Sequence, residues 1–188
     1  MLTAPEFARQ IYHSPIHALC TIGNRLKRYR WKSGDVFRIE LDSGRFCYSQ
    51  ACRHPEMSFF DHVDDGDLSL THVDTLPVAF RIFVHKSVPK ESDWQLLGNR
   101  AVRPELETTA LRFKQDIISG RLSLYHESFT APQFEKEATL AECAGLENVA
   151  VWELSHVMDR IAAHFSGEKC KWVMSLAINR SRVPADQR

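Results

Sequence analysis

The sequence predicts an α+β fold: a mostly antiparallel sheet, twisted or barrel-like, with one packed helix near the C-terminus. Strand-like segments dominate the chain and are joined by turns. They do not alternate with helical segments, as the strands of a parallel sheet would. One amphipathic pattern with helical periodicity lies near the C-terminus, and it accounts for the packed helix.

The composition is that of an ordinary globular domain. The chain has 188 residues, 44% of them hydrophobic and 26% charged, and this length suits one domain better than two. These values exclude intrinsic disorder, a collagen-like chain and a coiled coil. Lys and Arg number 24, as do Asp and Glu, so the formal net charge is zero. Such a balance argues against a protein built to coat nucleic acid.

The chain divides into three regions. Residues 1–32 form an N-terminal extension that is basic at its end, with a short helix expected over residues 5–12. Residues 33–178 are expected to form a single α+β domain. Residues 179–188 are a polar tail that we expect to be frayed.

The clearest local prediction is a hairpin from Asp35 to Cys52. Residues 35–41 alternate between apolar and polar side chains, as in a half-buried strand. Residues 42–45 form a tight turn that contains a glycine, the residue best suited to a positive φ. Residues 45–52 are the return strand, with aromatic side chains on one face.

Further strands are expected at residues 57–63 and 76–84, with an acidic, glycine-containing loop at residues 61–67. Trp94 lies in an otherwise polar segment that ends at Gly98. We favour the interpretation in which this aromatic ring plugs the open edge of the sheet over one in which it faces a partner.

A second hairpin is expected from residues 110–118 and 121–129, joined by a two-residue turn at Ser119 and Gly120. The periodicity of residues 111–118 is mixed, which leaves a helix open as the alternative.

Two helices and a last strand are expected in the C-terminal third. A short helix ends near Gly145, and a longer one runs from Ser155, as its N-cap, to Phe165, with Gly167 as the C-terminal signal. Residues 170–178 are predicted to be a strand.

The cysteines indicate a reducing compartment. There are five, at positions that are widely spaced, and an odd number does not suit a secreted disulfide framework. The N-terminal residues lack the apolar stretch of a signal peptide, and no run approaches the roughly 18 apolar residues that a membrane helix needs. We therefore expect a soluble, cytoplasmic protein with reduced thiols and no membrane contact.

Two clusters resemble metal sites without meeting their requirements. Residues 61–67 resemble the start of a calcium loop, but Val63 and His72 occupy two of the ligand positions, which favours a solvated acidic turn. Cys47, Cys52 and His54 are the nearest approach to a zinc cluster. The two cysteines differ by an odd number of positions and would face opposite sides of one strand. We predict no metal site.

The histidine pairs are also poor ligand candidates. His13 and His17 have the i, i+4 spacing of a helix, but Pro15 interrupts the helix that would align them. His156 and His164 are separated by about two turns on the predicted C-terminal helix, which favours partly exposed helix residues.

No nucleophile elbow, P-loop or dinucleotide-binding motif is present. His126 and Glu127 are a loose candidate for acid–base chemistry, and a hydrolase assembled from distant residues would need a pocket with a histidine and a carboxylate in contact. In residues 25–32, five of the eight residues are basic, with Tyr29 and Trp31 between them. This stretch suits nucleic-acid contact, but we favour a solvated entry to the first strand with both rings packed on the sheet.

The run from Arg30 to Phe46, followed by Tyr48, resembles the opening of the immunity protein 26 family. The shared features are a basic residue, Gly-Asp-Val-Phe, an alternating strand ending in Leu, a Gly-Arg turn and an aromatic return strand. Residues 94–98 resemble the family's Trp-to-Gly segment, so the resemblance covers about residues 28–100. The return strand lacks the second glycine of the family pattern, and the N-terminal extension has no counterpart in it.

The resemblance implies an immunity protein of a bacterial polymorphic toxin system. Such a protein binds its cognate toxin by direct protein–protein contact and neutralises it in the cytoplasm. The resemblance brings no catalytic residue, cofactor or metal, so we predict a non-enzyme whose partner is a protein toxin; its contacting surface and oligomeric state stay open. The alternative is a nucleic-acid-binding small β-barrel that uses residues 25–32.

Overall fold

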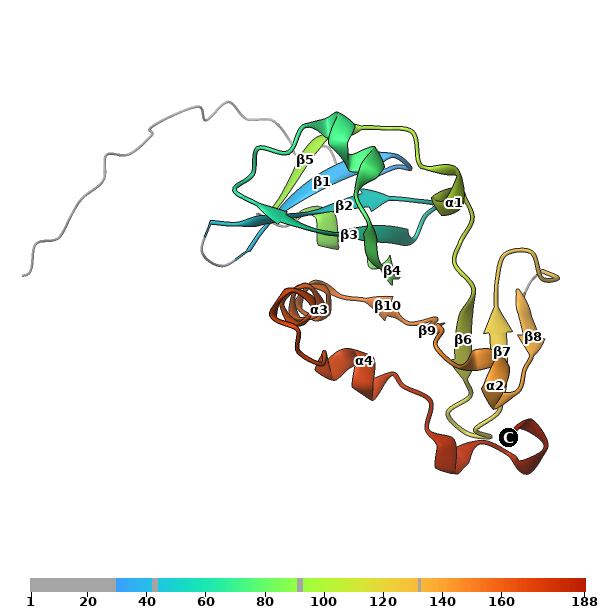
Figure 1. Ribbon diagram of the computed structural model, residues 1–188. Coiled ribbons are helices and arrows are strands. Elements are labelled where there is room, and N and C mark those ends of the chain that lie inside the picture. Colours follow the sequence, from blue (N-terminus) through green and yellow to red (C-terminus); the bar gives the residue numbers. More distant parts are fainter. Residues whose placement is uncertain (1–29, 42–43, 91–92, 132) are drawn as a thin grey trace, which may run out of the picture.

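A computed structural model of the chain describes residues 30–41, 44–90, 93–131 and 133–188. It confirms the mixed α+β fold: two open sheets, neither closed into a barrel, and a long helix near the C-terminus (Figure 1). The expected helix at residues 5–12 and the pair His13 and His17 lie outside the described residues.

The first sheet has six strands in the order β10-β4-β3-β2-β1-β5. Neighbouring strands are antiparallel, except that β10 pairs with β4 in parallel. The strands are β1 (Asp35–Glu40), β2 (Phe46–Ala51), β3 (Glu56–Asp64), β4 (Val78–Val84), β5 (Trp94–Asn99) and β10 (Val151–Trp152).

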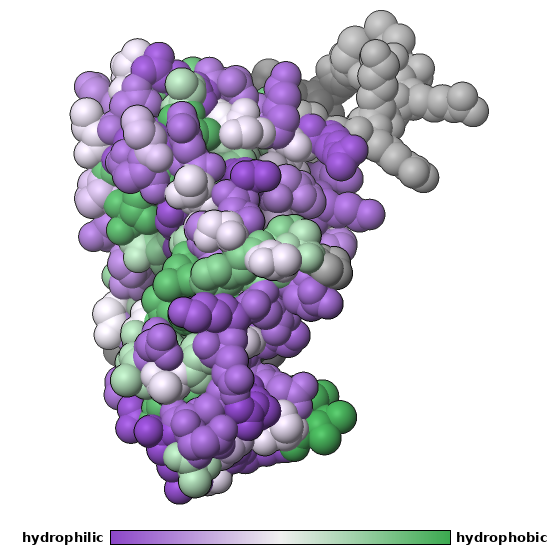
Figure 2. Space-filling model, turned by 90° about the vertical axis from the view of Figure 1, so that its right-hand side faces the viewer, coloured by the Kyte–Doolittle hydropathy of each residue, from purple (hydrophilic) through white to green (hydrophobic). Residues whose placement is uncertain are grey.

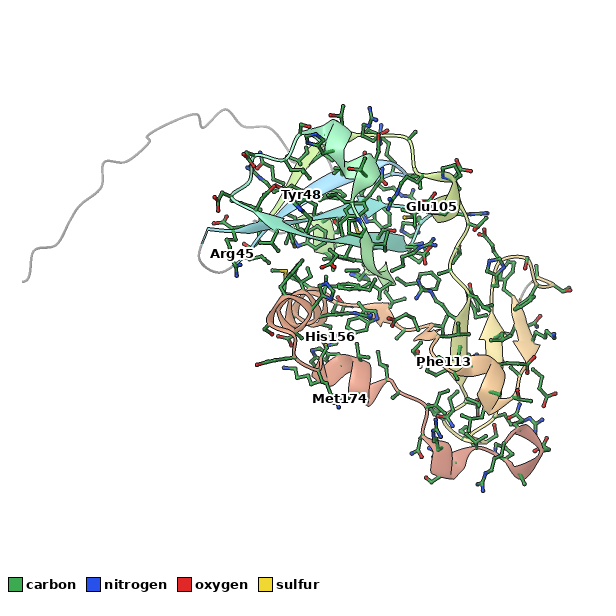
Figure 3. The ribbon with its side chains drawn as sticks, viewed as in Figure 1. Arg45, Tyr48, Glu105, Phe113, His156 and Met174 are labelled. Carbon is green, nitrogen blue, oxygen red and sulfur yellow. The ribbon has the colours of Figure 1, made fainter. Side chains whose placement is uncertain are left out.

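Both faces of the first sheet are covered. On one face, helix α3 (Leu154–Ser166) packs its Val157 and Ile161 into the main hydrophobic cluster of the molecule. On the other face, the 3-10 helix η1 (Leu70–Thr75) packs through Val73 against Tyr48, a strand residue labelled in Figure 3. Burial on two sides explains why apolar residues occur at both alternating positions of β1 and β3.

The second sheet has four strands in the order β8-β7-β6-β9. It is covered on one side by a smaller cluster that includes Phe113, Leu122 and Cys143. Its elements, with the short helices around it, are α1 (Pro104–Glu107), β6 (Arg112–Gln115), β7 (Leu122–Tyr125), β8 (Glu135–Glu137), α2 (Leu140–Cys143) and β9 (Glu147–Asn148). The first sheet also carries the 3-10 turn η2 (Val88–Lys90).

Both predicted hairpins form. β1 and β2 pair from Val36↔Gln50 to Glu40↔Phe46. β6 and β7 pair from Arg112↔Tyr125 to Gln115↔Leu122, so the helix alternative for residues 111–118 is wrong. The second turn is longer than the expected two residues, because the Asp116 N–H donates to the Arg121 carbonyl and leaves residues 117–120 as the loop.

The short helix near Gly145 is confirmed as α2, with a capping box between Thr139 and Glu142. Helix α3 is confirmed, and Gly167 ends it at φ 72°. Its N-cap is Glu153, two residues earlier than predicted, so Ser155 lies inside the helix and is not its N-cap.

Two predictions for the C-terminus are wrong. Residues 170–178 are not a strand: they contain the helix α4 (Lys171–Ser175), which places Trp172 and Leu176 on one face, where both pack against the main cluster. Residues 179–188 are not frayed: they form the 3-10 turns η3 (Arg180–Arg182) and η4 (Ala185–Gln187), which close the end of the second sheet. The Gln187 side chain is buried there and bonds to both the N–H and the carbonyl of Leu122.

Candidate binding surface

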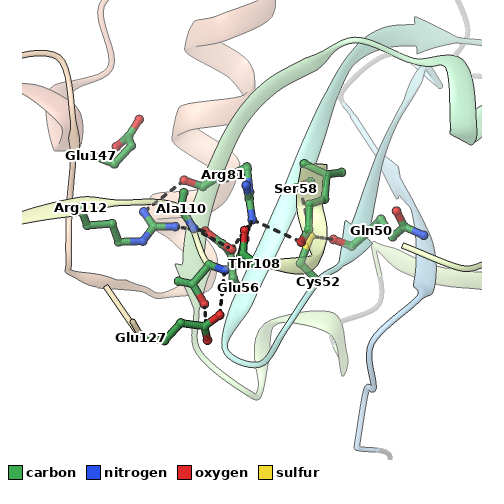
Figure 4. A network of polar contacts seen from close by, with 12 residues as sticks. Gln50, Cys52, Glu56, Ser58, Arg81, Thr108, Ala110, Arg112, Glu127 and Glu147 are labelled. Carbon is green, nitrogen blue, oxygen red and sulfur yellow. Dashed lines mark hydrogen bonds and ion pairs between the residues drawn. The ribbon is translucent and has the colours of Figure 1, made fainter. Parts of the chain in front are cut away.

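A buried carboxylate joins the two sheets (Figure 4). Glu56 of β3 is fully buried and pairs with Arg81 of β4 at 2.6 Å and with Arg112 of β6. The Ala110 N–H, at the entry to β6, donates to the same carboxylate at 3.2 Å. The second sheet is therefore attached to the first at the start of its central strand.

The two arginines extend this attachment. Arg81 donates to the Thr108 carbonyl at 2.6 Å and so holds the segment that links the sheets. Arg112 stacks its guanidinium 4.2 Å from the centre of the Phe83 ring. Burial lowers the pKa of Arg112, and the Glu56 carboxylate opposes that shift. Every oxygen of Glu56 accepts from these groups, so the cluster acts as a structural clamp.

A second clamp lies on the helix side. Arg160 of α3 forms a two-point ion pair with Glu147 of β9, one of its bonds measuring 2.9 Å. Its guanidinium lies 4.3 Å from the Phe80 ring centre and 5.0 Å from that of Trp152. A planar guanidinium can pair and stack at once, which ties α3, the first sheet and the second sheet together.

The acidic segment is a structural feature of the first sheet. Residues 61–64 belong to β3, so the predicted loop is shorter than residues 61–67. Asp64 accepts from the Tyr48 hydroxyl at 2.5 Å and from the Gly66 N–H at 2.8 Å. Partial burial raises the pKa of Asp64, but these hydrogen bonds outweigh it and hold the pKa below its usual value.

Cys47, Cys52 and His54, the nearest approach to a zinc cluster in the sequence, each contact other groups. Cys47 packs in the main hydrophobic cluster, where burial raises the pKa of its thiol to about 12. Cys52 lies 3.1 Å from the Ser58 hydroxyl. His54 stacks against Trp31 at a ring-centre distance of 4.8 Å. Within the described residues, no group of three or more His, Cys, Asp or Glu side chains is arranged to hold a metal ion.

The histidines considered for catalysis or ligation contact other groups. His126 bonds to Ser128, whereas Glu127 pairs with Arg53 at 2.7 Å and accepts from Thr109. His126 and Glu127 therefore have different partners. On α3, His156 stacks on Trp172 and His164 bonds to Asp61 at 2.9 Å, and both histidines are partly exposed, as predicted.

The aromatic residues singled out in the sequence are core residues. Trp31 is buried in the main cluster, as the favoured interpretation expected, whereas Tyr29 lies outside the described residues. Trp94 lies on the edge strand β5 and is buried against Phe37 and Phe59, which confirms that it plugs the edge. Neither indole offers a face for stacking a nucleotide base.

Among the residues that the structure describes, the most exposed large apolar side chains lie together on the β6–β7 turn. Ile117 is 80% exposed and Ile118 is 86% exposed. The other exposed large apolar residues among those the structure describes are between 38% and 54% exposed: Leu96, Leu111, Val151, Val173 and Met174. Figure 2 shows a hydrophobic projection at the lower end of the molecule, the end at which Figure 1 shows the β6–β7 turn. We call residues 116–120 the isoleucine turn.

Hydrogen bonds fix the conformation of the isoleucine turn from within. The Asp116 carboxylate accepts from the Ser119 N–H at 2.6 Å, the Ser119 hydroxyl at 2.8 Å and the Ile118 N–H at 3.0 Å. These bonds, the backbone bond from Ser119 first, lower the pKa of Asp116. The turn therefore keeps its shape at any pH at which this carboxylate is ionised.

The C-terminal segment supports the turn from below. Arg182 of η3 donates to the carbonyls of both Ile117 and Ile118, the latter at 3.1 Å. Gly120 has φ +75° and lies against the Arg182 backbone, where a Cβ atom would overlap the Arg182 carbonyl. Gln115 exchanges hydrogen bonds with the backbone of Asn179 at 2.8 and 3.1 Å. The most exposed apolar pair is thus held in one conformation.

Sequence reasoning missed this turn because it assigned Ile117 and Ile118 to the end of a strand. A signal was present: β-branched apolar residues are uncommon in turns, where Gly, Asn, Asp, Pro and Ser dominate. Two of them between Asp116 and Ser119-Gly120 therefore give this turn an unusually apolar composition.

Comparison with known proteins identifies one relationship. The family model described as immunity protein 26 matches residues 32–124. This region contains the first sheet from β1 to β5, the linking segment and most of the β6–β7 hairpin, including the isoleucine turn. The curated proteins and the solved structures contain no significant match. Within the described residues, no helix is both long and apolar enough to cross a membrane.

Proposed function

We propose that the protein binds a cognate bacterial toxin and neutralises it by direct contact, on the premise that its residues 32–124 match the model of the immunity protein 26 family. The family match is the observation that carries this proposal. The protein would act in the cytoplasm of the cell that makes the toxin, and its effect would come from occupying the toxin's surface rather than from a reaction of its own.

The architecture supports a binding role. A toxin inhibitor needs a rigid frame, because each side chain ordered on binding costs affinity. Here the two sheets are clamped by two sets of ion pairs, Glu56 with Arg81 and Arg112, and Glu147 with Arg160. The isoleucine turn stands on that frame with its backbone already held. Exposed, preorganised apolar side chains are the kind that become energetic centres of protein interfaces.

Co-expression tests the proposal. The toxin domain encoded beside this gene is expressed in a sensitive host with this protein, with an empty vector, or with an unrelated immunity protein. We expect survival only with this protein, and a stable complex when an inactivated toxin domain is mixed with the purified chain. Survival no better than with the empty vector, together with no complex, would contradict the proposal.

The dose of this protein needed against the active toxin separates neutralisation by contact from an enzymatic mode of protection. A protein that acts by contact protects in proportion to its amount and must reach at least the amount of toxin present. A protein that acts catalytically protects at far lower amounts. Protection that persists at a small fraction of one copy per toxin would contradict neutralisation by contact.

A further inference from the structure

We infer that Ile117 and Ile118 are the contact with the toxin, inserted together into a concave apolar pocket of the toxin domain. This inference rests on the proposed function and goes further, since it names the surface and the chemistry of the partner. Three properties of the isoleucine turn carry it: its exposure, the internal satisfaction of its polar groups, and the charge beside it.

The exposed isoleucine pair is unfavourable in water, and the packing of the domain does not compensate for it. Both side chains are at least 80% exposed, so they contribute almost nothing to the hydrophobic cores of the two sheets. Removing two such side chains from water in a partner's pocket is favourable by the same hydrophobic effect that stabilises a core. An exposed apolar pair on a rigid support is therefore a source of binding energy.

Four backbone groups at the apex of the turn can leave water without losing their hydrogen bonds. The Asp116 carboxylate accepts hydrogen bonds from the N–H groups of Ile118 and Ser119. The Arg182 guanidinium donates to the carbonyls of Ile117 and Ile118. A polar group that enters an apolar environment unpaired is strongly penalised, but these groups stay paired. The apex thus suits an apolar pocket better than a polar or phosphate-lined surface. Nucleic acid, which is bound by cationic and aromatic side chains, does not fit isoleucine.

The charge next to the turn points to an acidic rim on the pocket. Arg121 is paired with Glu137 and Asp186, and the Asp116 carboxylate is occupied within the turn. Arg180 and Arg182 of η3 are exposed, and no carboxylate of the described residues pairs with either. Carboxylates around the apolar pocket of the toxin would complement them and speed the encounter at low salt.

Affinity measurements on the full chain test the inference. The probe is the purified, inactivated toxin domain, and binding is measured by calorimetry or interferometry. We expect the double variant Ile117→Ser, Ile118→Ser to bind about 100-fold more weakly than wild type, since each residue is an anchor of the contact. Both side chains are exposed, so thermal unfolding followed by circular dichroism should stay that of wild type.

A matched control removes the same kind of side chain elsewhere. The double variant Leu96→Ser, Met174→Ser also deletes two exposed apolar side chains, on β5 and α4, away from the turn. It is expected to bind the toxin within about threefold of wild type. Arg182→Ala keeps both isoleucines but removes their support, and it should weaken binding by about tenfold, mainly through faster dissociation.

The outcomes separate the inference from the proposed function. If the isoleucine double variant stays folded and binds the toxin as wild type does, the inference is overturned and the proposed function stands. If wild type itself neither binds nor protects, both fall. If the serine variant unfolds, a photo-crosslinking residue placed at position 118 gives the answer: a crosslink to the toxin, absent with the same residue at position 96, supports the contact, and no crosslink overturns it. Self-association through the turn, with toxin binding intact in the variant, also overturns it.

Discussion

The two sheets are stabilised in different ways. The six-stranded sheet buries both of its faces, under α3 on one side and η1 on the other. The four-stranded sheet buries one face with a smaller cluster and is attached through Glu56 and Arg160. The first sheet is therefore a scaffold stabilised by its own core, and the second is a platform that depends on polar clamps and on the C-terminal segment.

This difference has a functional consequence. The isoleucine turn lies on the weaker sheet, where no extensive core restrains it, and its rigidity comes from Asp116, Gln115 and Arg182. A contact surface can vary on such a platform while the scaffold stays the same. How far the second sheet depends on its clamps can be tested by substitution and by labelling.

The largest effect is expected at the buried carboxylate. Glu56→Ala leaves the guanidiniums of Arg81 and Arg112 without their counter-ion, one of them fully buried. We expect the free energy of unfolding to fall by about 3–5 kcal/mol, measured by chemical denaturation. The control Glu135→Ala breaks the exposed pair with Lys114 and should cost at most about 1 kcal/mol. Equal losses in the two variants would show that Glu56 is not a clamp.

The next effect concerns the support of the isoleucine turn. Gly120 and Gly145 both have positive φ, +75° and +78°, but a Cβ at Gly120 would overlap the Arg182 backbone and one at Gly145 would meet open space. Gly145→Ala should cost about 1 kcal/mol for the left-handed conformation alone. Gly120→Ala should cost about 2–3 kcal/mol, because backbone has to move as well. Chemical denaturation of the two variants compares their losses of stability directly. An equal loss in both would show that the contact between Gly120 and the Arg182 backbone does not support the turn.

Thiol labelling compares the two cores without mutation. Cys47 lies in the main cluster and Cys143 in the smaller one, and both are almost fully buried, so each reacts only when its region opens. We expect Cys143 to be alkylated about tenfold faster than Cys47, as a difference in opening free energy of about 1.4 kcal/mol would produce. Peptide mass spectrometry resolves the two sites. Faster labelling at Cys47 would reverse the proposed order of stability.

The smallest effect is a dependence of stability on alkaline pH. Burial raises the pKa of Cys47 to about 12, whereas a thiol in the unfolded chain ionises near pH 8.5. The contribution of this thiol to the free energy of unfolding is fully present below about pH 8.5. It is lost as the pH rises toward about 12, because over this range only the unfolded state releases the proton. Cys47→Ala should therefore lose about 0.7 kcal/mol less stability than wild type between pH 8 and pH 9. Parallel losses in both proteins would exclude Cys47 as the source.

Sequence reasoning succeeded where local patterns dominate. The hairpin of β1 and β2 follows from alternation around Gly44, and α3 follows from its apolar stripe and from Gly167. It failed where partners are distant. Residues 170–178 alternate well enough for a strand, but Trp172 and Leu176 find a common core only as a helix. Gln187 is polar and near the end of the chain, and only its bonds to Leu122 and Ala138 bury it.

The candidate surface shows the same division. That Ile117 and Ile118 follow a strand and precede a glycine is plain in the sequence. That they stand exposed in one fixed conformation depends on Arg182, more than sixty positions away along the chain. The clamp of Glu56 likewise draws on Arg112, which lies in a different sheet.

The sequence by itself determined the α+β class, the two hairpins and the long helix, because periodicity, turn residues and caps act over a few positions and need no knowledge of the rest of the chain. Only the tertiary structure decided which charges are buried together, how the C-terminal segment packs and which apolar side chains are left outside. Those outcomes depend on contacts between residues far apart in the sequence, and such contacts form only when the whole chain folds.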